Sequence, residues 1–374
     1  MHDLTVFVGG STGSDPYSST TWSGSSPFFL NALDQAGILD KAVGLKLPSL
    51  QNYGYLAKNF TPNRAVWRKH FYFDPAYRCA LTQTARNIPV TSPFCLQIGH
   101  MFSLPAVFPN KKCISYHDGN LAELLNSGFG IEGVSRKRID QALRYEEDAA
   151  QQMTAIFTFS EYLRQSFIHD YRVPAERVFQ VGGAVNFTEA PPAITNKDYT
   201  TNRILFIGTE FKRKGGPQLL EAFSVVRQAI PSAELHIVGP RTLDTVPPGV
   251  VFHGHLSKAD PTQSAKLQVL FRTSNLFVLP SLYEPFGIAP LEAMLCGLPA
   301  AVTNAWALRE CVTPGVNGYL VEKGNAQDLA AKITLLLSDP DRLAIMGQQA
   351  REIVLSRYTW PAVATRIANI IQSL

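Results

Sequence analysis

The feature that most constrains this sequence is a recurring order of elements: a short apolar run of strand length, in several cases closed by glycine, that leads into a segment of helical periodicity. The first unit is LTVFVGG (Leu4–Gly10), followed by a serine-rich loop and a helical segment with Pro27 in its first turn. Strand, glycine loop and helix in that order begin a parallel α/β unit, because a helix connects each strand to the next parallel one. The chain is therefore expected to be of the α/β class.

The repeated units form two series. Residues 183–202 separate them, contain a proline pair and lack periodicity, which indicates a linker. Two domains also fit the length of 374 residues, at about 100–200 residues per domain. The sequence predicts two doubly wound, Rossmann-like domains that face a cleft. The strand-length runs are Cys95–Gly99, Lys112–Asp118, Ala155–Ser160 and 177–181 before the linker, and Arg203–Gly208, Glu234–Gly239, Val250–Gly254, Asn275–Ser281 and Pro299–Asn304 after it.

Composition and charge argue against several classes of protein. The net charge is +4, and Lys/Arg exceed Asp/Glu by the same small margin in both halves, so we expect no nucleic-acid partner. The five cysteines lack CxxC spacing, which favours reduced core residues in a cytosolic protein. The chain enters its first strand without a signal-like region, and no apolar stretch is long enough to span a bilayer. A cytoplasmic protein is expected.

Three short basic clusters lie in the first half: Arg68–Lys69, Lys111–Lys112 and Arg136–Lys137–Arg138. A solvated surface is the favoured interpretation. The alternative left open is an anionic acceptor or a membrane surface, which would make the protein membrane-associated.

Two glutamates eight positions apart, Glu284 and Glu292, stand in the otherwise apolar run SLYEPFGIAPLEAMLCGLP. A strand, a tight loop and a helix from about Phe286 to Cys296 are predicted here. The free N–H groups at the helix start, together with the two acids, would suit a sugar nucleotide, with sugar hydroxyls at one end and a ribose diol at the other. The alternative is a helix-start acid and a solvated one.

A basic turn follows the first strand of the second series, in LFIGTEFKRKGGPQLLEAF. The cations Lys212, Arg213 and Lys214 come just before a helix expected to start around Gly215–Gly216. Cations beside a helix N-terminus predict a diphosphate site that could neutralise a leaving nucleoside diphosphate. The spacing differs from a Walker loop, so triphosphate hydrolysis is not indicated.

The segments EPFGIAPLEAMLCGLP, KRKGGPQLLEAF and YTWPAVATRI together resemble retaining glycosyltransferases of the GT-B fold, in particular family GT4. The resemblance covers the C-terminal half well and the N-terminal half more loosely. It implies an acceptor-binding domain over residues 1–183, a donor-nucleotide-binding domain over 184–357, and a final helix over 358–374 that packs back on the first domain. It also implies a hexosyltransferase of the polysaccharide-biosynthesis type.

The resemblance assigns roles to the second domain. Glu284 would contact the donor sugar and Glu292 the nucleotide ribose, while Lys214 would bind the diphosphate. The loop amides that would touch sugar and phosphate belong to Phe286, Gly287 and Ile288, and Pro285 of the same loop is also expected to be a donor-binding residue. The family usually has an arginine after the strand glycine, where this chain has Thr209, and Arg213 is the candidate substitute.

In the first domain the resemblance places Gly9 and Gly10 beside the donor phosphates. It places His117 near the reacting centre, with Asp118 orienting the imidazole or contacting the acceptor. A structural role is the alternative for a lone histidine, and His100 competes for the same function.

The reaction implied is metal-independent, retaining transfer from a UDP- or GDP-sugar to a hydroxyl of a glycan, glycolipid or small molecule, without a cofactor. No DxD motif precedes the predicted cleft, since the DPD at Asp339–Asp341 lies between two late helical segments, and no Ser/His/Asp or Cys/His nucleophile group stands out. The alternatives are an epimerase or phosphorylase of the same fold and a non-catalytic sugar-nucleotide-binding protein. A dehydrogenase would need a GxGxxG loop, which VGGSTG and IGTEFK do not match.

Overall fold

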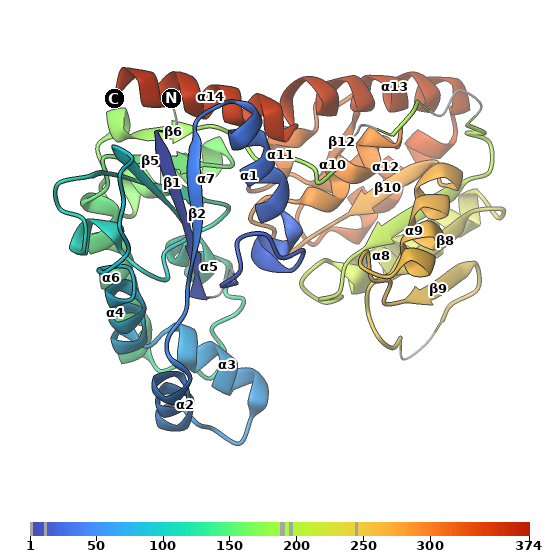
Figure 1. Ribbon diagram of the computed structural model, residues 1–374. Coiled ribbons are helices and arrows are strands. Elements are labelled where there is room, and N and C mark those ends of the chain that lie inside the picture. The colour runs from blue at the N-terminus through green and yellow to red at the C-terminus, as the bar shows by residue number, and fades with distance from the viewer. Residues whose placement is uncertain (1–2, 11–12, 188–190, 194–196, 244–245) are drawn as a thin grey trace. The chain divides into compact units, whose positions relative to one another are not determined.

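The computed structural model describes residues 3–10, 13–187, 191–193, 197–243 and 246–374. The chain divides into two compact units (Figure 1): Met1–Asn186 with Trp360–Leu374, and Phe187–Thr359. Each unit contains a six-stranded parallel sheet, so the predicted α/β class with two Rossmann-like domains is confirmed. The predicted cleft stays a prediction.

The first unit has the strand order β2-β1-β3-β4-β5-β6. All neighbouring strands are parallel. Strand β2 was not predicted from the sequence. The strands are β1 (Leu4–Gly9), β2 (Leu39–Leu45), β3 (Phe94–Ile98), β4 (Lys112–His117), β5 (Ala155–Thr158) and β6 (Val178–Gln180). The main helices are α1 (Ser26–Gln35), α2 (Ser49–Lys58), α3 (Arg64–Tyr72), α4 (Pro75–Gln83), α5 (Leu121–Ser127), α6 (Arg136–Gln151), α7 (Glu161–His169) and α14 (Trp360–Ser373).

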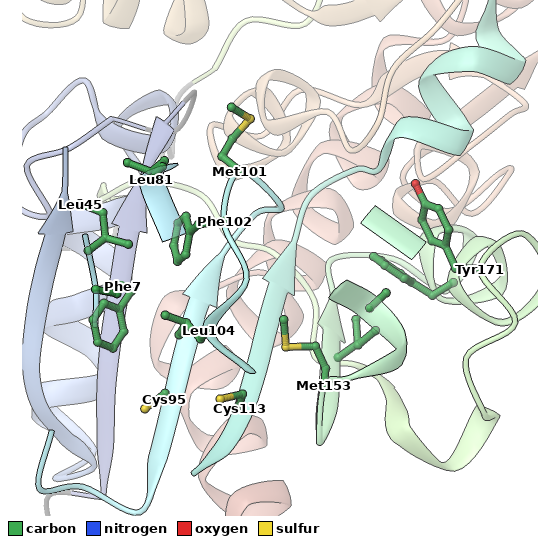
Figure 2. Close-up of a cluster of buried hydrophobic side chains, with 14 of the residues drawn as sticks. Phe7, Leu45, Leu81, Cys95, Met101, Phe102, Leu104, Cys113, Met153 and Tyr171 are labelled. Atoms are coloured by element: carbon green, nitrogen blue, oxygen red, sulfur yellow. The ribbon is translucent and has the colours of Figure 1, made fainter. Parts of the chain in front are cut away.

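Both faces of this sheet are covered, because successive strand residues point to opposite sides. Cys113 of β4 faces a core formed with α4, α6 and α7, in which Leu81, Met153 and Phe167 are buried (Figure 2). Tyr116 of the same strand faces the other side and contacts the ring of Phe29 on α1. A strand that is buried on both faces must be apolar along most of its length, which explains the continuous apolar runs in the sequence.

Helix α14 ends the chain but belongs to the first unit. The Trp360 ring lies against those of Trp22 and Phe29, and its Nε1 donates a hydrogen bond of 2.9 Å to Asn186 Oδ1. Arg366 Nε donates to the carbonyl of Val181 at 2.6 Å. The final helix is thus part of the core of the first unit.

The second unit has the strand order β12-β11-β10-β7-β8-β9. Its strands are parallel as well. The strands are β7 (Arg203–Ile207), β8 (Glu234–Val238), β9 (Val250–Gly254), β10 (Leu276–Leu279), β11 (Ala300–Thr303) and β12 (Gly318–Val321), the last not predicted. The helices are α8 (Gly216–Ala229), α9 (Pro261–Thr273), α10 (Ile288–Leu295), α11 (Leu308–Cys311), α12 (Ala326–Leu337) and α13 (Pro340–Arg357).

Cys95, Cys113 and Cys311 are buried free thiols, whereas Cys79 is exposed and Cys296 half-buried, so the expectation of five core cysteines was too broad. Among the described residues no helix is long and apolar enough to cross a membrane.

Candidate functional site

The topology of the second sheet selects one place for ligand binding. The chain runs from β7 outward through β8 to β9, and then returns to place β10 on the other side of β7. The loops after β7 and β10 therefore leave the sheet in opposite directions and lie side by side at their start. Open α/β sheets bind ligands at this point, outside the carboxyl ends of the strands.

The loop after β7 carries the predicted basic turn. It closes at Gly215, the N-cap of α8, which has a φ of 75°. A Cβ on Gly215 would lie 2.0 Å from the carbonyl oxygen of Pro280, so only glycine allows the two loops to approach this closely. The close approach places the side chains of Arg213 and Lys214 beside the loop after β10.

Both cations lie beside the carboxylate of the predicted acid Glu284. Lys214 Nζ forms an ion pair with Glu284 Oε2, and Arg213 Nη1 lies 3.9 Å from the same oxygen. Arg213 also donates to the carbonyl of Tyr283 at 2.7 Å and bonds to Glu210 Oε2 through Nε at 2.7 Å. Glu284 is only 6% exposed, so its charge depends on these partners.

The other members of the turn do not join this group. Lys212 is exposed and has no contact with Glu284 among the described residues. Thr209, at the position where the family that the sequence resembles usually has arginine, is exposed on the same loop. Arg213, by contrast, has a side chain that is only 19% exposed and is held toward Glu284.

Helix α10 begins two residues later than predicted. It starts at Ile288, because its N-cap Gly287 has a φ of 96°, a left-handed conformation that interrupts the helix. Phe286 is buried before the helix and lies near the ring of Tyr358. Of the three predicted helix-end amides, only that of Ile288 belongs to the first turn. Pro285 is half-buried in the loop.

The second predicted acid has a partner that the sequence did not reveal. Glu292 Oε1 forms an ion pair with Lys258 Nζ, from the loop between β9 and α9. The Glu292 side chain is 15% exposed and that of Lys258 is 58% exposed. No spacing rule links positions 258 and 292, so only the folded sheet brings them together.

The glycines predicted in the first unit lie at the equivalent point of their own sheet, where β3 returns to the other side of β1. Gly9 ends β1, and Gly10 has a φ of 69°. A Cβ on Gly10 would lie 2.5 Å from that of Met101, so both the conformation and the space require glycine.

His117 is the last residue of β4 and is 1% exposed. Its ring stacks on that of His100, with centroids 3.8 Å apart and planes 14° apart. Neither ring nitrogen of His117 has a hydrogen-bond partner within the described ranges. Burial, with His100 alongside, lowers the pKa of His117 well below its usual value, so the imidazole is neutral at pH 7.

Asp118 follows His117 and is exposed. It accepts a hydrogen bond from the Trp22 side chain. Trp22 has a φ of 50°, a conformation that is rare for a bulky residue. The Trp22 side chain thus helps to hold the Asp118 carboxylate, for which the resemblance predicts contact with the imidazole or the acceptor.

The predicted site residues therefore form two groups. Arg213, Lys214 and Glu284 are in contact in the second unit, while Gly9, Gly10, His117 and Asp118 occupy strand ends of the first. That both groups form one site stays a prediction. In the part of the chain that the structure describes, no three His, Cys, Asp or Glu side chains are arranged to hold a metal ion. The group in the second unit offers cations, a carboxylate and helix-end amides, which suits a ligand with phosphates and hydroxyls.

Residues 188–353 match the family described as Glycosyl transferases group 1. The chain is 30% identical over 226 residues to a D-inositol 3-phosphate glycosyltransferase of Thermobispora bispora, covering 55% of this chain and 53% of that protein. It is 31% identical over 176 residues to a GDP-mannose-dependent monoacylated alpha-(1-6)-phosphatidylinositol monomannoside mannosyltransferase of Corynebacterium glutamicum, covering 43% and 44%. The chain spans about half the length of these curated relatives.

Solved structures resemble the whole chain. Sucrose-phosphate synthase of Thermosynechococcus elongatus aligns with a TM-score of 0.71 at 18% identity, covering 99% of this chain and 98% of that one. HepE of Anabaena, in complex with UDP and glucose, aligns with a TM-score of 0.66 at 17% identity, covering 100% of both chains. At such identities the likeness concerns the fold.

Proposed function

We propose that this chain is a GT-B glycosyltransferase of group 1 that transfers a sugar from a nucleoside-diphosphate sugar to an acceptor hydroxyl with retention of anomeric configuration. The observation that carries the proposal is the convergence of Lys214 and Arg213 on Glu284 at the point where the second sheet reverses direction. Two cations and a buried carboxylate at this point can bind the diphosphate and a sugar hydroxyl of one ligand.

The proposed donor would be bound along the loops after β7 and β10. Lys214 and Arg213 would neutralise the charge of the diphosphate in place of a metal ion. Glu284 would then accept hydrogen bonds from the sugar, and Glu292 from the ribose. Phe286, Gly287 and Ile288 would supply backbone N–H groups to sugar and phosphate.

The proposed reaction breaks the bond between the anomeric carbon and the diphosphate oxygen and forms one to the acceptor oxygen. The acceptor attacks on the face that the diphosphate leaves, and its proton passes to a diphosphate oxygen. The transition state resembles an oxocarbenium ion, so most of the developing negative charge is on the leaving group. Stabilisation by Lys214 and Arg213 therefore acts mainly on the transition state. His117 would lie near the reacting centre as a neutral imidazole.

The nature of the donor and acceptor is supported only by relatives. The Corynebacterium relative is named as GDP-mannose-dependent, and HepE was solved with UDP and glucose. A UDP- or GDP-hexose is the donor class that we propose. The acceptor is a hydroxyl of a glycan, glycolipid or small molecule.

The test is a panel of UDP- and GDP-sugars, first by thermal shift and then by sugar transfer in the presence of a chelator. A bound donor raises the melting temperature by mass action. We expect one donor class to do so, and we expect Lys214→Ala and Glu284→Ala each to lower turnover about 100-fold or more, because each removes one positioned charge.

Lys212→Ala is the matched control, since it removes a neighbouring exposed cation and should leave turnover near that of the unaltered chain. Normal turnover in both Lys214→Ala and Glu284→Ala would overturn the site. Conversion of the donor without any acceptor would point to an epimerase, and phosphate-dependent cleavage to a phosphorylase.

A further inference from the structure

Helix α2 and the turn after it expose an unusual amount of apolar surface. Leu50 is 85% exposed, Tyr53 68% and Phe60 64%, the three highest values among the large hydrophobic residues that the structure describes. Leu50, Tyr53 and Ala57 are spaced i, i+3 and i+7, so they share one face of the helix. Single exposed apolar residues are common, but a continuous stripe marks an interaction surface.

The opposite face of α2 anchors the helix to the first unit. The Tyr55 ring lies edge-on to that of Tyr77, and its hydroxyl donates to the carbonyl of Ala76 at 3.1 Å. Trp67 Nε1 of α3 donates to the carbonyl of Leu56 at 2.8 Å, so the two helices are tied together (Figure 1). Leu50 and Tyr53 take no part in these contacts.

The same segment is strongly basic. Residues 41–73 contain no Asp or Glu. Lys46, Lys58 and Arg64 are exposed, although Lys58 also lies 3.4 Å from the buried carboxylate of Asp74. The side chains of residues 68 and 69 lie outside the described part of the chain. The cations of this stretch are Lys41, Lys46, Lys58, Arg64, Arg68 and Lys69.

The fold places a second basic cluster, at the start of α6, beside this basic segment. The start of α6 lies beside α3, because Arg138 Nη1 donates to the carbonyl of His70 at 3.4 Å and the His70 ring bonds to the carbonyl of Gly133. Arg136 and Lys137 are exposed there, Arg136 in an ion pair with Asp140. Cations in the first turn of a helix oppose its dipole, so this cluster does not stabilise α6.

We propose that α2, the turn at Phe60, α3 and the start of α6 form a docking face for an anionic lipid bilayer. Exposed aromatic and aliphatic side chains enter the boundary between headgroups and acyl chains, while Lys and Arg contact anionic headgroups. An anionic bilayer fits both properties, the apolar stripe and the excess of cations over acids. The proposal concerns the first unit alone and does not depend on sugar transfer.

The test is flotation of the full chain with vesicles of phosphatidylcholine containing phosphatidylglycerol, beside vesicles of phosphatidylcholine alone, at low and raised salt. We expect binding to the anionic vesicles, and weaker binding at raised salt because the charges are screened. Leu50→Asp with Tyr53→Asp should weaken binding about tenfold or more, and Arg64→Glu with Lys137→Glu by a similar factor at low salt.

Ile345→Asp, 59% exposed on α13, and Arg86→Glu, exposed in the first unit, are matched controls that should bind normally. Circular dichroism and the melting temperature check that each variant is folded. Absence of binding to anionic vesicles overturns the proposal. Loss of binding in the charge-reversal variant but not in Leu50→Asp with Tyr53→Asp also overturns the proposal and indicates a soluble polyanion as the partner. A change of oligomeric state in Leu50→Asp with Tyr53→Asp overturns it as well and indicates that a second copy covers this face.

Discussion

At the scale of single residues, two buried carboxylates of this protein, Glu284 and Glu146, each lie beside partners that compensate their charge. Glu284 is nearly inaccessible, yet two cations from another loop surround it. Glu146 of α6 is 4% exposed and is paired with Arg78 at 3.2 Å. It also accepts hydrogen bonds from Tyr171 Oη at 2.8 Å and from the N–H of Leu121 at 3.0 Å. Removing one partner of such a group leaves the other charge buried and unpaired.

We therefore predict that Glu146→Gln lowers the free energy of unfolding by about 3 kcal/mol at pH 7. Burial raises the pKa of Glu146. His100, Arg78 and the hydrogen bonds together lower this pKa by more than burial raises it, so it lies below its ordinary value. A carboxyl group whose pKa is lower in the folded than in the unfolded chain stabilises the fold at pH values above its unfolded-state pKa. This stabilisation is lost as the pH falls through the folded-state pKa.

The difference between Glu146→Gln and the unaltered chain should consequently narrow as the pH falls below about 4. Urea unfolding followed at several pH values measures this. Glu147→Gln, the next residue on α6 and only half-buried, is the control. A constant difference across the acid range would contradict the assignment of the stability to the ionised carboxylate.

At the scale of elements, the sequence located the strands of the sheet interior and missed two at the edges. Strands β2 and β12 each end a sheet. Edge strands have fewer buried positions, and β2 carries exposed or half-buried residues at all but its two ends. Its apolar pattern is therefore weak, whereas a central strand such as β10 is buried throughout. An edge position weakens the apolar pattern without always hiding it, because the other two edge strands, β6 and β9, were predicted from the sequence.

The contact between the loops after β7 and β10 leads to a prediction at this scale. Gly215→Ala should lower the free energy of unfolding by about 2–4 kcal/mol, of which roughly 1 comes from the left-handed conformation and the rest from collision with the backbone of Pro280. The loop that carries Lys214 should move, so the thermal shift caused by the donor should also be lost.

Gly254→Ala is the matched control for this variant, because Gly254 has a φ of 68° and a Cβ added there would meet nothing within 4 Å. It should show only the conformational cost of about 1 kcal/mol. Equal losses in the two variants, measured by urea unfolding, would mean that the approach of the two loops contributes nothing.

At the scale of the whole molecule, the last helix stabilises the unit that contains the first residues of the chain. Trp360 is 3% exposed and contacts rings from three separated segments, those of Trp22, Phe29 and Phe159. Trp360→Ala should remove about 3–5 kcal/mol from the stability of the first unit, because it leaves a cavity in that core. The second unit should be unaffected.

Hydrogen exchange followed by mass spectrometry can separate these effects. We expect faster exchange in strands β1 and β4 and unchanged exchange in β7 and β10. Asn369→Ala, exposed on the same helix, is the control and should leave both units as they were. Faster exchange in the second unit alone would contradict the placement of α14 in the first.

The sequence by itself determined the local chemistry: which runs become buried strands, where glycine ends them, and which loops carry Glu284, Glu292 and the Arg213–Lys214 turn. These properties follow from neighbours along the chain. Tertiary structure alone decided the pairs between distant positions, such as Lys258 with Glu292 and His100 with His117, and the meeting of α3 with the start of α6. The physical reason is that strand order sets which loops become neighbours in a parallel sheet, and no local periodicity encodes that order.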